Sequence, residues 1–337
     1  MSGAPTQAQL ALPGLDEGAA EVEWVWTEDP LEDAVPQEFA HTTVMRNEVR
    51  DALSPEDGKV YVDCTLGGGG HTRAILELAP GARVIAFDRD DVALAAAKKN
   101  LETFGDRVTF VKTTFGRVRE ALDGIGVTRV DGLCADLGVS SPQLDEASRG
   151  MSFRREGPID MRMDQSSGDT ALDLIEQLSD DELADVIFRY GDERRSRRIA
   201  RSIKKAFADG ELGTTLDLRR AIVRAVGPSR VGGVDPATRT FQALRIKVNE
   251  ELAELESLLA QLPEVLAEGA VAAILSFHSH EDRLVKRAFV TESFSALTKK
   301  PLMATEEECA ENPRSRSAKM RAARLVVDEA GDEGESP

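Results

Sequence analysis

The sequence predicts an α/β fold in which a doubly wound sheet is interrupted by a block of helices. In KVYVDCTLGGGGHT at 59–72, a buried strand ends at an acid and is followed by four glycines and a helix start. In RVIAFDRD at 83–90, a second apolar strand again ends at an acid. Between about 144 and 231 the chain loses its strand-like character, which indicates inserted helices. Strand, glycine loop and helix in this order open nucleotide-binding folds.

The glycine loop matches the dinucleotide fingerprint G-x-G-x-x-G only in part. Gly67 and Gly69 fit, but Thr72 stands where the third glycine is expected. Asp63, four residues before the glycines, would repel a pyrophosphate and favour the cationic sulfonium and amino groups of S-adenosylmethionine. Asp88 follows Gly67 by 21 residues, the spacing at which an acid accepts hydrogen bonds from ribose hydroxyls. We therefore predict a nucleoside-type cofactor, although glycine turns and strand-end acids also occur in other α/β proteins.

The other elements of the sheet are predicted from their apolar patterns. Before the helical block, the patterns predict helices at 72–79 and 90–103, and strands at 60–66, 83–87, 108–112 and 130–136. After the block, they predict one amphipathic helix from Phe241 to Leu262, stopped by Pro263, and strands at 270–279, near 295–299 and at 319–327. Ligands of an open α/β sheet bind at the carboxyl ends of its strands. The candidate residues at or just past these ends are Asp63, Asp88, Phe115 and Asp136.

The net charge of −18 is concentrated at the two ends of the chain. Residues 1–40 hold nine acids and no Lys or Arg, and residues 325–337 hold five acids and no Lys or Arg. The body between them is therefore nearly neutral and can carry basic patches. We expect residues 1–37 to be a disordered acidic tail, in which Trp24 and Trp26 are unexplained, and residues 326–337 to be a second acidic tail.

The same composition predicts a cytoplasmic protein without a membrane span. No run of 18 apolar residues is present, and the N-terminus lacks the basic and apolar regions of a signal peptide. Three widely spaced cysteines indicate reduced thiols and no zinc site. The expected domains are a first sheet part at 38–143, a helical insertion at 144–231 and a second sheet part at 232–325.

The helical insertion carries a concentrated basic segment. Residues 189–205 have a net charge of +6, while Ile199, Ile203 and Phe207 form a separate apolar stripe on the helix expected at 193–208. The planar guanidinium of arginine suits phosphate, so we predict that Arg194, Arg198 and Arg201 contact the phosphates of a nucleic acid. A solvated helix face is the alternative. In that case we expect the nucleic acid to follow Arg154, Arg155 and Arg162.

Nine segments in fixed order resemble the RsmH (MraW) family over about residues 40–325. They are HTTVM at 41–45, DCTLGGGGHT at 63–72, AFDRD at 86–90, DLGVSSPQLD at 136–145, RGMSFRREGPIDMRMD at 149–164, YGDERRSRRIARSI at 190–203, PATRTFQALRIKVNEEL at 236–252, SFHSHEDRLVKR at 276–287 and ENPRSRSAKMRAA at 311–323. The resemblance implies a Rossmann-like S-adenosylmethionine-dependent methyltransferase with an inserted helical domain. It further implies methylation of the exocyclic N4 of cytosine 1402, in the customary numbering, in the decoding centre of 16S rRNA.

The resemblance also implies the cofactor-binding residues. They are Gly69, Gly70, His71, Asp88, Phe115, Asp136 and Gln143. The expected substrate is 16S rRNA within the small ribosomal subunit, and the oligomeric state is left open, with a homodimer among the alternatives. A non-catalytic ribosome-assembly factor on the same fold and, with less support, an NAD-dependent oxidoreductase are the alternative functions.

The methylation chemistry points to one acid in particular. Cytosine N4 is a poor nucleophile because its lone pair is delocalised, so the site needs acceptors for the amine hydrogens. Asp136 and the carbonyls of the Ser140-Ser141-Pro142 turn are the candidates, and holding the cofactor is the equally supported alternative role of Asp136. Because the base must leave its stack, a loop or single strand is the expected target.

A metal site near the end of the chain is not favoured. The family usually has leucine where this chain has His280. Together with His278, Glu281 and Asp282, His280 forms a group of potential metal ligands. We expect His278 and His280 to share one face of an extended chain, and the sequence offers no third well-spaced ligand.

Overall fold

The computed structural model describes residues 43–228 and 234–326, so both predicted acidic tails, with Trp24 and Trp26, lie outside the described residues, apart from residue 326. A single mixed sheet has the strand order β3-β2-β1-β4-β5-β8-β6, with β7 paired to β8. The parallel strands are β1 (Val60–Asp63), β2 (Arg83–Asp88), β3 (Val108–Lys112), β4 (Val130–Asp136) and β5 (Leu266–Ser276). Antiparallel to them at the other edge is β8 (Lys319–Leu325), which pairs with β6 (Phe294–Ala296) and β7 (Leu302–Met303).

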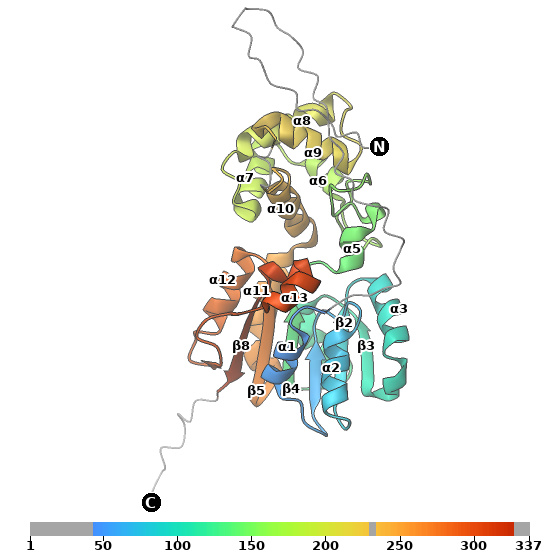
Figure 1. The fold of residues 1–337 in the computed structure, drawn as a ribbon, viewed down its shortest axis with the longest axis vertical. Helices are drawn as coiled ribbons and strands as arrows, with labels where there is room; N and C mark the ends of the chain where they lie inside the picture. The colour runs from blue at the N-terminus through green and yellow to red at the C-terminus, as the bar shows by residue number, and fades with distance from the viewer. Residues whose placement is uncertain (1–42, 229–233, 327–337) are drawn as a thin grey trace, which may run out of the picture. The chain divides into compact units, whose positions relative to one another are not determined.

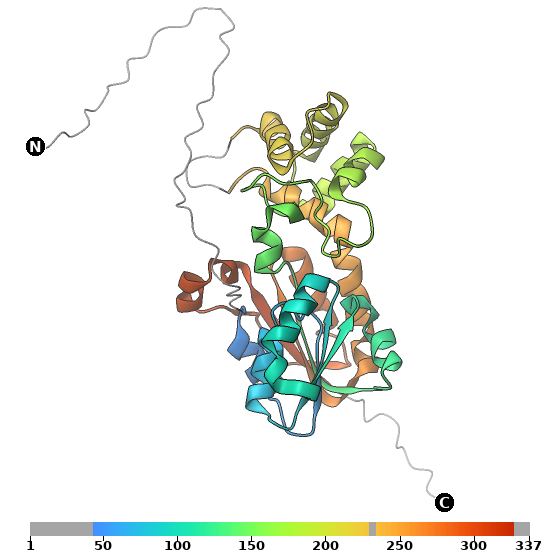
Figure 2. The same cartoon turned by 90° about the vertical axis from the view of Figure 1, so that its right-hand side faces the viewer.

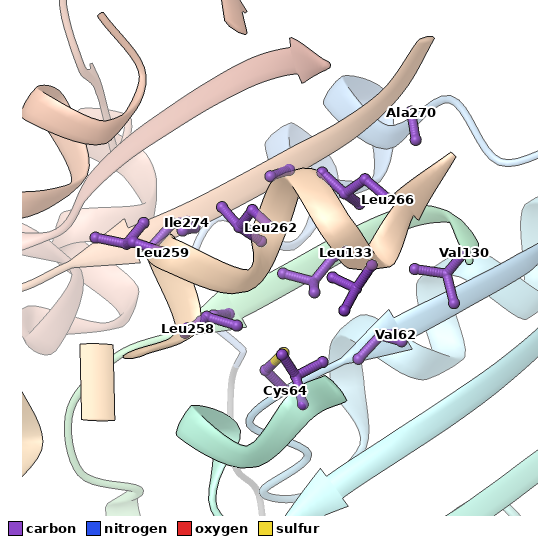
Figure 3. Close-up of a cluster of buried hydrophobic side chains, with 14 of the residues drawn as sticks. Val62, Cys64, Val130, Leu133, Leu258, Leu259, Leu262, Leu266, Ala270 and Ile274 are labelled. Atoms are coloured by element: carbon purple, nitrogen blue, oxygen red, sulfur yellow. The ribbon is translucent and has the colours of Figure 1, made fainter. Parts of the chain in front are cut away.

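Helices cover both faces of this sheet, because alternate strand residues point to opposite sides. One face packs against α1 (Arg46–Leu53), α2 (Gly70–Leu78) and α3 (Asp91–Asn100). The other face packs against α4 (Val118–Gly124), α11 (Glu251–Val265) and α12 (Ser279–Ala288). Figure 3 shows the second face, where Leu258 and Leu262 of α11 lie against Val62 and Leu133 of the strands. The predicted α/β fold class is confirmed.

A separate hydrophobic core holds the helical domain together. It contains side chains of α6 (Ala171–Gln177), α7 (Asp180–Gly191), α8 (Ser196–Ala208), α9 (Thr215–Val226) and α10 (Thr238–Asn249). Figures 1 and 2 show these helices grouped on the side where the parallel strands end. A capping box starts α7, since Ser179 and Glu182 bond each other's backbone N–H groups. Helix α10 packs in this core, so the helical domain extends beyond the boundary expected at 231.

The prediction of one long helix from Phe241 to Leu262 is wrong. The segment forms two helices, α10 and α11, which are separated by Glu250 in the left-handed conformation with φ of 52°. The periodicity runs through the break because each helix buries its own stripe, Phe241 and Leu244 in the helical core and Leu255 and Leu262 in the sheet core. Pro263 lies inside the last turn of α11 and does not stop it.

Most other differences lie at the ends of elements. Strand β1 ends at Asp63 because the chain turns into the glycine loop there, whereas β5 begins earlier than expected, at Leu266. The helix predicted at 90–103 ends at Asn100 and continues as a 3-10 helix, Glu102–Arg107. The helix predicted at 193–208 begins at Ser196. Strand β7 was not predicted, because its two residues are too few to show an alternating apolar pattern.

Candidate cofactor and methyl-transfer site

A cavity lies at the carboxyl ends of β1, β2 and β4, where the strand order reverses between β1 and β4. Such a switch point is where open α/β sheets bind ligands. Six of the seven predicted cofactor residues line it, namely Gly70, His71, Asp88, Phe115, Asp136 and Gln143. The seventh, Gly69, is buried and is not among the lining residues.

The glycine loop is shaped by its contacts with the rest of the domain. Gly69 precedes α2 with φ of 84°, and a Cβ on it would lie 2.7 Å from the Leu101 side chain. A Cβ on Gly70 would lie 1.7 Å from the Thr43 hydroxyl oxygen. Glycine at 69 therefore serves backbone conformation and packing, and glycine at 70 lets Thr43 reach the cavity.

Asp63 does not reach the ligand, contrary to the sequence interpretation. Its carboxylate is fully buried behind the loop and accepts hydrogen bonds from the Thr72 hydroxyl at 2.7 Å and the Thr65 N–H at 3.2 Å. Burial raises the pKa of Asp63. Asp63 is thus a structural support of the loop, and the acids that line the cavity are Asp88, Asp136, Glu251 and Glu281.

Asp88 holds the glycine loop against β2. One carboxylate oxygen accepts from the Gly67 N–H at 2.9 Å and the other from the Asp90 N–H at 2.9 Å. Burial raises the pKa of Asp88 to about 6. A ribose would add hydroxyl donors to a carboxylate that already has two, which the four lone-pair positions of a carboxylate allow.

His71 and Asp136 face each other in the cavity. The His71 Nε2 lies 3.6 Å from the Asp136 Oδ2, and the imidazole is 4% exposed. Neither ring nitrogen of His71 has a hydrogen-bond partner among the described residues. Because buried polar groups in proteins are nearly always bonded, an unpartnered imidazole lining a cavity favours a ligand there.

In the turn after β4, two of the backbone carbonyls proposed as acceptors already accept hydrogen bonds within the protein. Ser140 caps α5 (Ser141–Asp145), and its carbonyl accepts the Leu144 N–H at 3.3 Å. The Pro142 carbonyl accepts the Glu146 N–H at 2.9 Å. The Ser140 and Pro142 carbonyls are therefore already bonded within the α5 turn, whereas the Asp136 carboxylate lines the cavity as a charged acceptor.

Gln143 is engaged at both ends of its amide. Its oxygen accepts from the Ser140 N–H at 3.0 Å, and its nitrogen donates to the Asp90 carboxylate at 3.0 Å. Phe115 begins the 3-10 helix Phe115–Arg117, lines the cavity and packs against the sheet core. Gln143 thus fixes the cavity wall, and Phe115 contributes an aromatic side chain to the lining.

Several lining residues were not predicted individually. They are Thr43, Thr65, Arg89, Met163, Glu251, Phe277, Glu281, Asn312 and Arg314. Most of them lie in the segments that resemble the MraW family, so the family resemblance could have indicated them. Phe277 packs close to Gly138, where a Cβ would lie 3.2 Å from its ring. Arg314 pairs with Asp145 at 2.7 Å, joining the last part of the chain to α5.

The histidines near β5 are arranged differently from the prediction. His278 caps α12 and His280 lies inside it, so they do not share the face of an extended chain. Glu251, His278 and Glu281 place potential ligand atoms within 4.8 Å of one another. However, Arg245 donates to both Glu251 oxygens, at 2.8 and 2.9 Å, and so supplies the positive charge there. We derive no metal chemistry from this group.

The basic segment of the helical domain splits into two classes. Lys204 donates to carbonyls at the end of α6, and Lys205 pairs with Asp209. In contrast, Arg194, Arg198 and Arg201 are exposed, and no hydrogen bond or ion pair occupies their side chains among the described residues. Arg198 and Arg201 are three residues apart on one side of α8, and Arg194 directly precedes the N-cap of this helix, Arg195.

The fold and the cavity define a Rossmann-like α/β protein with a helical insertion and a ligand cavity at the strand switch point. A family model described as the MraW methylase family matches residues 38–326. The chain is 62% identical over 292 residues to the ribosomal RNA small subunit methyltransferase H of Sorangium cellulosum, covering 86% of this chain and 92% of that protein. It is 48% identical to the protein of that name in Prochlorococcus marinus, over 86% of this chain and 95% of that protein.

The chain therefore belongs to the MraW methylase family. This membership confirms S-adenosylmethionine as the cofactor, and an acidic cavity at a strand switch point with an aromatic wall fits that cationic nucleoside. A solved rRNA methylase from Streptococcus thermophilus is 10% identical with a TM-score of 0.40, over 84% of this chain and 94% of that chain. This similarity is too weak to indicate a function. Among the described residues, no helix is long and apolar enough to cross a membrane.

Proposed function

We propose that the protein transfers the methyl group of S-adenosylmethionine to the exocyclic N4 of cytosine 1402 in the decoding centre of 16S rRNA. The named relatives are ribosomal RNA small subunit methyltransferases, which supports rRNA as the substrate class. The observation that carries the proposal is the Asp136 carboxylate, which lines the cavity beside an unpartnered, buried His71. An acceptor at this position suits an amine substrate that must lose a proton.

The chain's residues would assist an in-line displacement. When bound, S-adenosylmethionine supplies an electrophilic methyl group on a cationic sulfur. The Asp136 carboxylate would accept a hydrogen bond from the N4 amine, which localises the nitrogen lone pair for attack, and would then hold the proton that the nitrogen gives up. Asp88 and Asp136 line the same cavity, and their negative field favours a positively charged sulfur.

The flipped cytosine needs an apolar platform as well as an acceptor. Phe277 follows β5 and lines the cavity beside Gly138. Bases taken out of a stack are usually held against aromatic side chains. We place the cytosine ring near Phe277 and the adenine near Phe115, at opposite parts of the cavity lining.

We further propose that Arg194, Arg198 and Arg201 bind phosphates of 16S rRNA in the small ribosomal subunit. Their exposure and lack of partners support this role, because paired arginines would have to break an ion pair first. The alternative path is weaker at Arg162, which is bound to both oxygens of Asp160, and at Arg155, which donates to the Asp145 carbonyl. The proposed site of action is the cytoplasm, where ribosomal subunits mature.

The test is methylation in vitro. Purified protein is incubated with labelled S-adenosylmethionine and small ribosomal subunits from a strain lacking this methyltransferase, and the RNA is digested to nucleosides. Label in N4-methylcytidine supports the proposal, and label in another nucleoside contradicts the assignment. A thermal shift with S-adenosylhomocysteine but not with NAD excludes the oxidoreductase alternative.

A further inference from the structure

Three consecutive residues at the end of β2, Asp88, Arg89 and Asp90, lie between the cofactor cavity and the helical domain. Two segments cross between the sheet and that domain, and we call them the crossing segments. They are residues 149–163, which lead out after α5, and residues 245–251, which return into α11. Both crossing segments are bonded to the end of β2.

The outgoing crossing segment is anchored by a buried ion pair. The Arg149 guanidinium, 3% exposed, donates to the Asp90 carboxylate at 2.8 Å and to the Met163 carbonyl at 2.5 Å. Asp90 is itself 6% exposed and also receives the Gln143 amide. A buried, multiply bonded pair of this kind is costly to open, because either partner alone would be an uncompensated charge.

The returning crossing segment is anchored by a buried amide. The Asn249 side chain is bonded to the outgoing segment on both sides, accepting from the Met163 N–H at 2.7 Å and donating to the Met161 carbonyl at 2.7 Å. The backbone carbonyl of Asn249 accepts from the Arg89 guanidinium at 3.0 Å. Asn249 thus joins the two crossing segments to each other and to β2.

Each crossing segment also contains a residue in an unfavourable backbone conformation. Met161 has φ of 63° and Glu250 has φ of 52°. The left-handed region is unfavourable for a residue with a side chain, so it persists only where neighbouring contacts hold it. These two positions mark where the crossing segments would relax if the anchoring contacts opened.

We propose that Arg149 and Asn249 are positioning residues that couple occupancy of the cofactor cavity to the position of the helical domain. The link is short, since the Asp90 N–H donates to the same Asp88 carboxylate that lines the cavity. A ligand that orders Asp88 therefore orders residues 88–90 and, through them, both crossing segments. This inference rests on the proposed function, in which the cavity holds the methyl donor and the helical domain holds the RNA. Coupling of this kind is reciprocal, so bound RNA would tighten cofactor binding by the same factor.

The test is hydrogen–deuterium exchange of the full-length protein with and without S-adenosylhomocysteine. In the wild type, the ligand slows exchange in the glycine loop at 64–70 and in both crossing segments. In Arg149→Gln, protection of the glycine loop remains, protection of the crossing segments is lost, and affinity for S-adenosylhomocysteine falls about fivefold or more. Arg119→Gln is the matched control, because Arg119 also binds an acid, Asp123, and two carbonyls, but all within the sheet domain.

A second variant covers the case in which Arg149→Gln fails to fold. Arg149→Lys keeps the charge beside Asp90 but loses the planar fork, and we expect partial loss of protection in the crossing segments and an intermediate affinity. A rise in the KM for RNA in both Arg149 variants, absent in Arg119→Gln, is the expected kinetic result. Full protection of the crossing segments in both variants would overturn the coupling, as would their lack of protection in the wild type. Failure of S-adenosylhomocysteine to bind the wild type at all would instead contradict the proposed function.

Discussion

The Nε2 atom of His71, at the start of α2, lies 3.6 Å from the Oδ2 atom of Asp136, at the end of β4. The two residues come from opposite sides of the strand switch point and meet over the cavity. Asp136 is partly exposed to the cavity, whereas His71 is buried, so the carboxylate is the member of the pair that a substrate amine can reach. The chemical step is therefore predicted to depend on Asp136.

Replacing Asp136 with asparagine should lower the single-turnover methylation rate about 10²-fold or more, the usual contribution of a positioned proton acceptor. The amide keeps the shape of the side chain but cannot take the proton. Rapid-quench measurement at saturating cofactor and RNA checks this. Asp131→Asn, on the same strand but paired with Lys59 away from the cavity, is the control. A wild-type rate restored by saturating cofactor would make Asp136 a binding residue only.

Replacing Asp88 with alanine should weaken S-adenosylmethionine binding by about 1.5–3 kcal/mol, the value of hydrogen bonds to a charged acceptor. Part of this loss comes from the glycine loop, because the Gly67 N–H loses its acceptor. Calorimetric titration measures it, with Asp91→Ala as the control, since Asp91 is a neighbouring exposed acid paired with Lys112. Equal affinity in both folded variants would show that Asp88 does not hold the ligand.

The raised pKa of Asp88 predicts a pH dependence of stability. The carboxyl group has a pKa of about 6 in the folded protein against an ordinary value of 3.8, so the folded state binds more protons between these values. The contribution of Asp88 to the free energy of unfolding is therefore fully present below about pH 4 and is lost as the pH rises through 6. The full effect is about 3 kcal/mol at most.

Urea unfolding of the wild type and Asp88→Asn at several pH values tests this dependence. The difference in the free energy of unfolding between the two proteins should change between about pH 4 and 6 and be constant above about 7. Ribose hydroxyls favour the ionised carboxylate, so affinity for S-adenosylhomocysteine should rise over the same range in the wild type and less in the variant. A pH-independent difference in stability would contradict the raised pKa.

Replacing Arg194, Arg198 and Arg201 together with glutamine should weaken binding to rRNA or the small subunit. The salt dependence should flatten by close to one phosphate contact for each arginine that touches the RNA backbone. Affinity for S-adenosylhomocysteine should be unchanged, because none of the three lines the cavity.

The control carries the same change in net charge. It replaces three arginines that are already paired with carboxylates, Arg46, Arg117 and Arg224. Binding of both triple variants is measured across a salt series. An identical slope and affinity for the two would mean that the basic segment is a solvated surface and that the RNA follows another path.

The local sequence was sufficient to predict the ends of β2, β3 and β4, and with them part of the cavity. Asp88 and Asp136 each follow an apolar run, and a strand's period and its terminating acid are both local features. The strand order then brings these two ends together on either side of β1. The family resemblance added His71 and Gln143, which no periodicity indicates.

Contacts between distant parts of the chain could not be predicted. The break at Glu250 is set by Asn249, whose side chain binds backbone nearly 90 residues away, at Met161 and Met163. Asp63 looked like a cavity residue because it ends β1, but its direction is fixed by the Thr72 hydroxyl behind the loop. Arg314 reaches the cavity because the 3-10 helix Pro313–Ser317 lies beside α5, where Arg314 pairs with Asp145.

The central claim is N4 methylation of one cytosine, and mass spectrometry of 16S rRNA tests it most directly. The fragment that contains position 1402 is compared between a deletion strain, the strain complemented with the wild type, and the strain complemented with Asp136→Asn. We predict that N4-methylcytosine is absent after deletion, restored by the wild type and strongly reduced with Asp136→Asn. Unchanged N4 methylation in the deletion strain would contradict the account. Full restoration of N4 methylation by the Asp136→Asn protein would contradict the proposed role of Asp136.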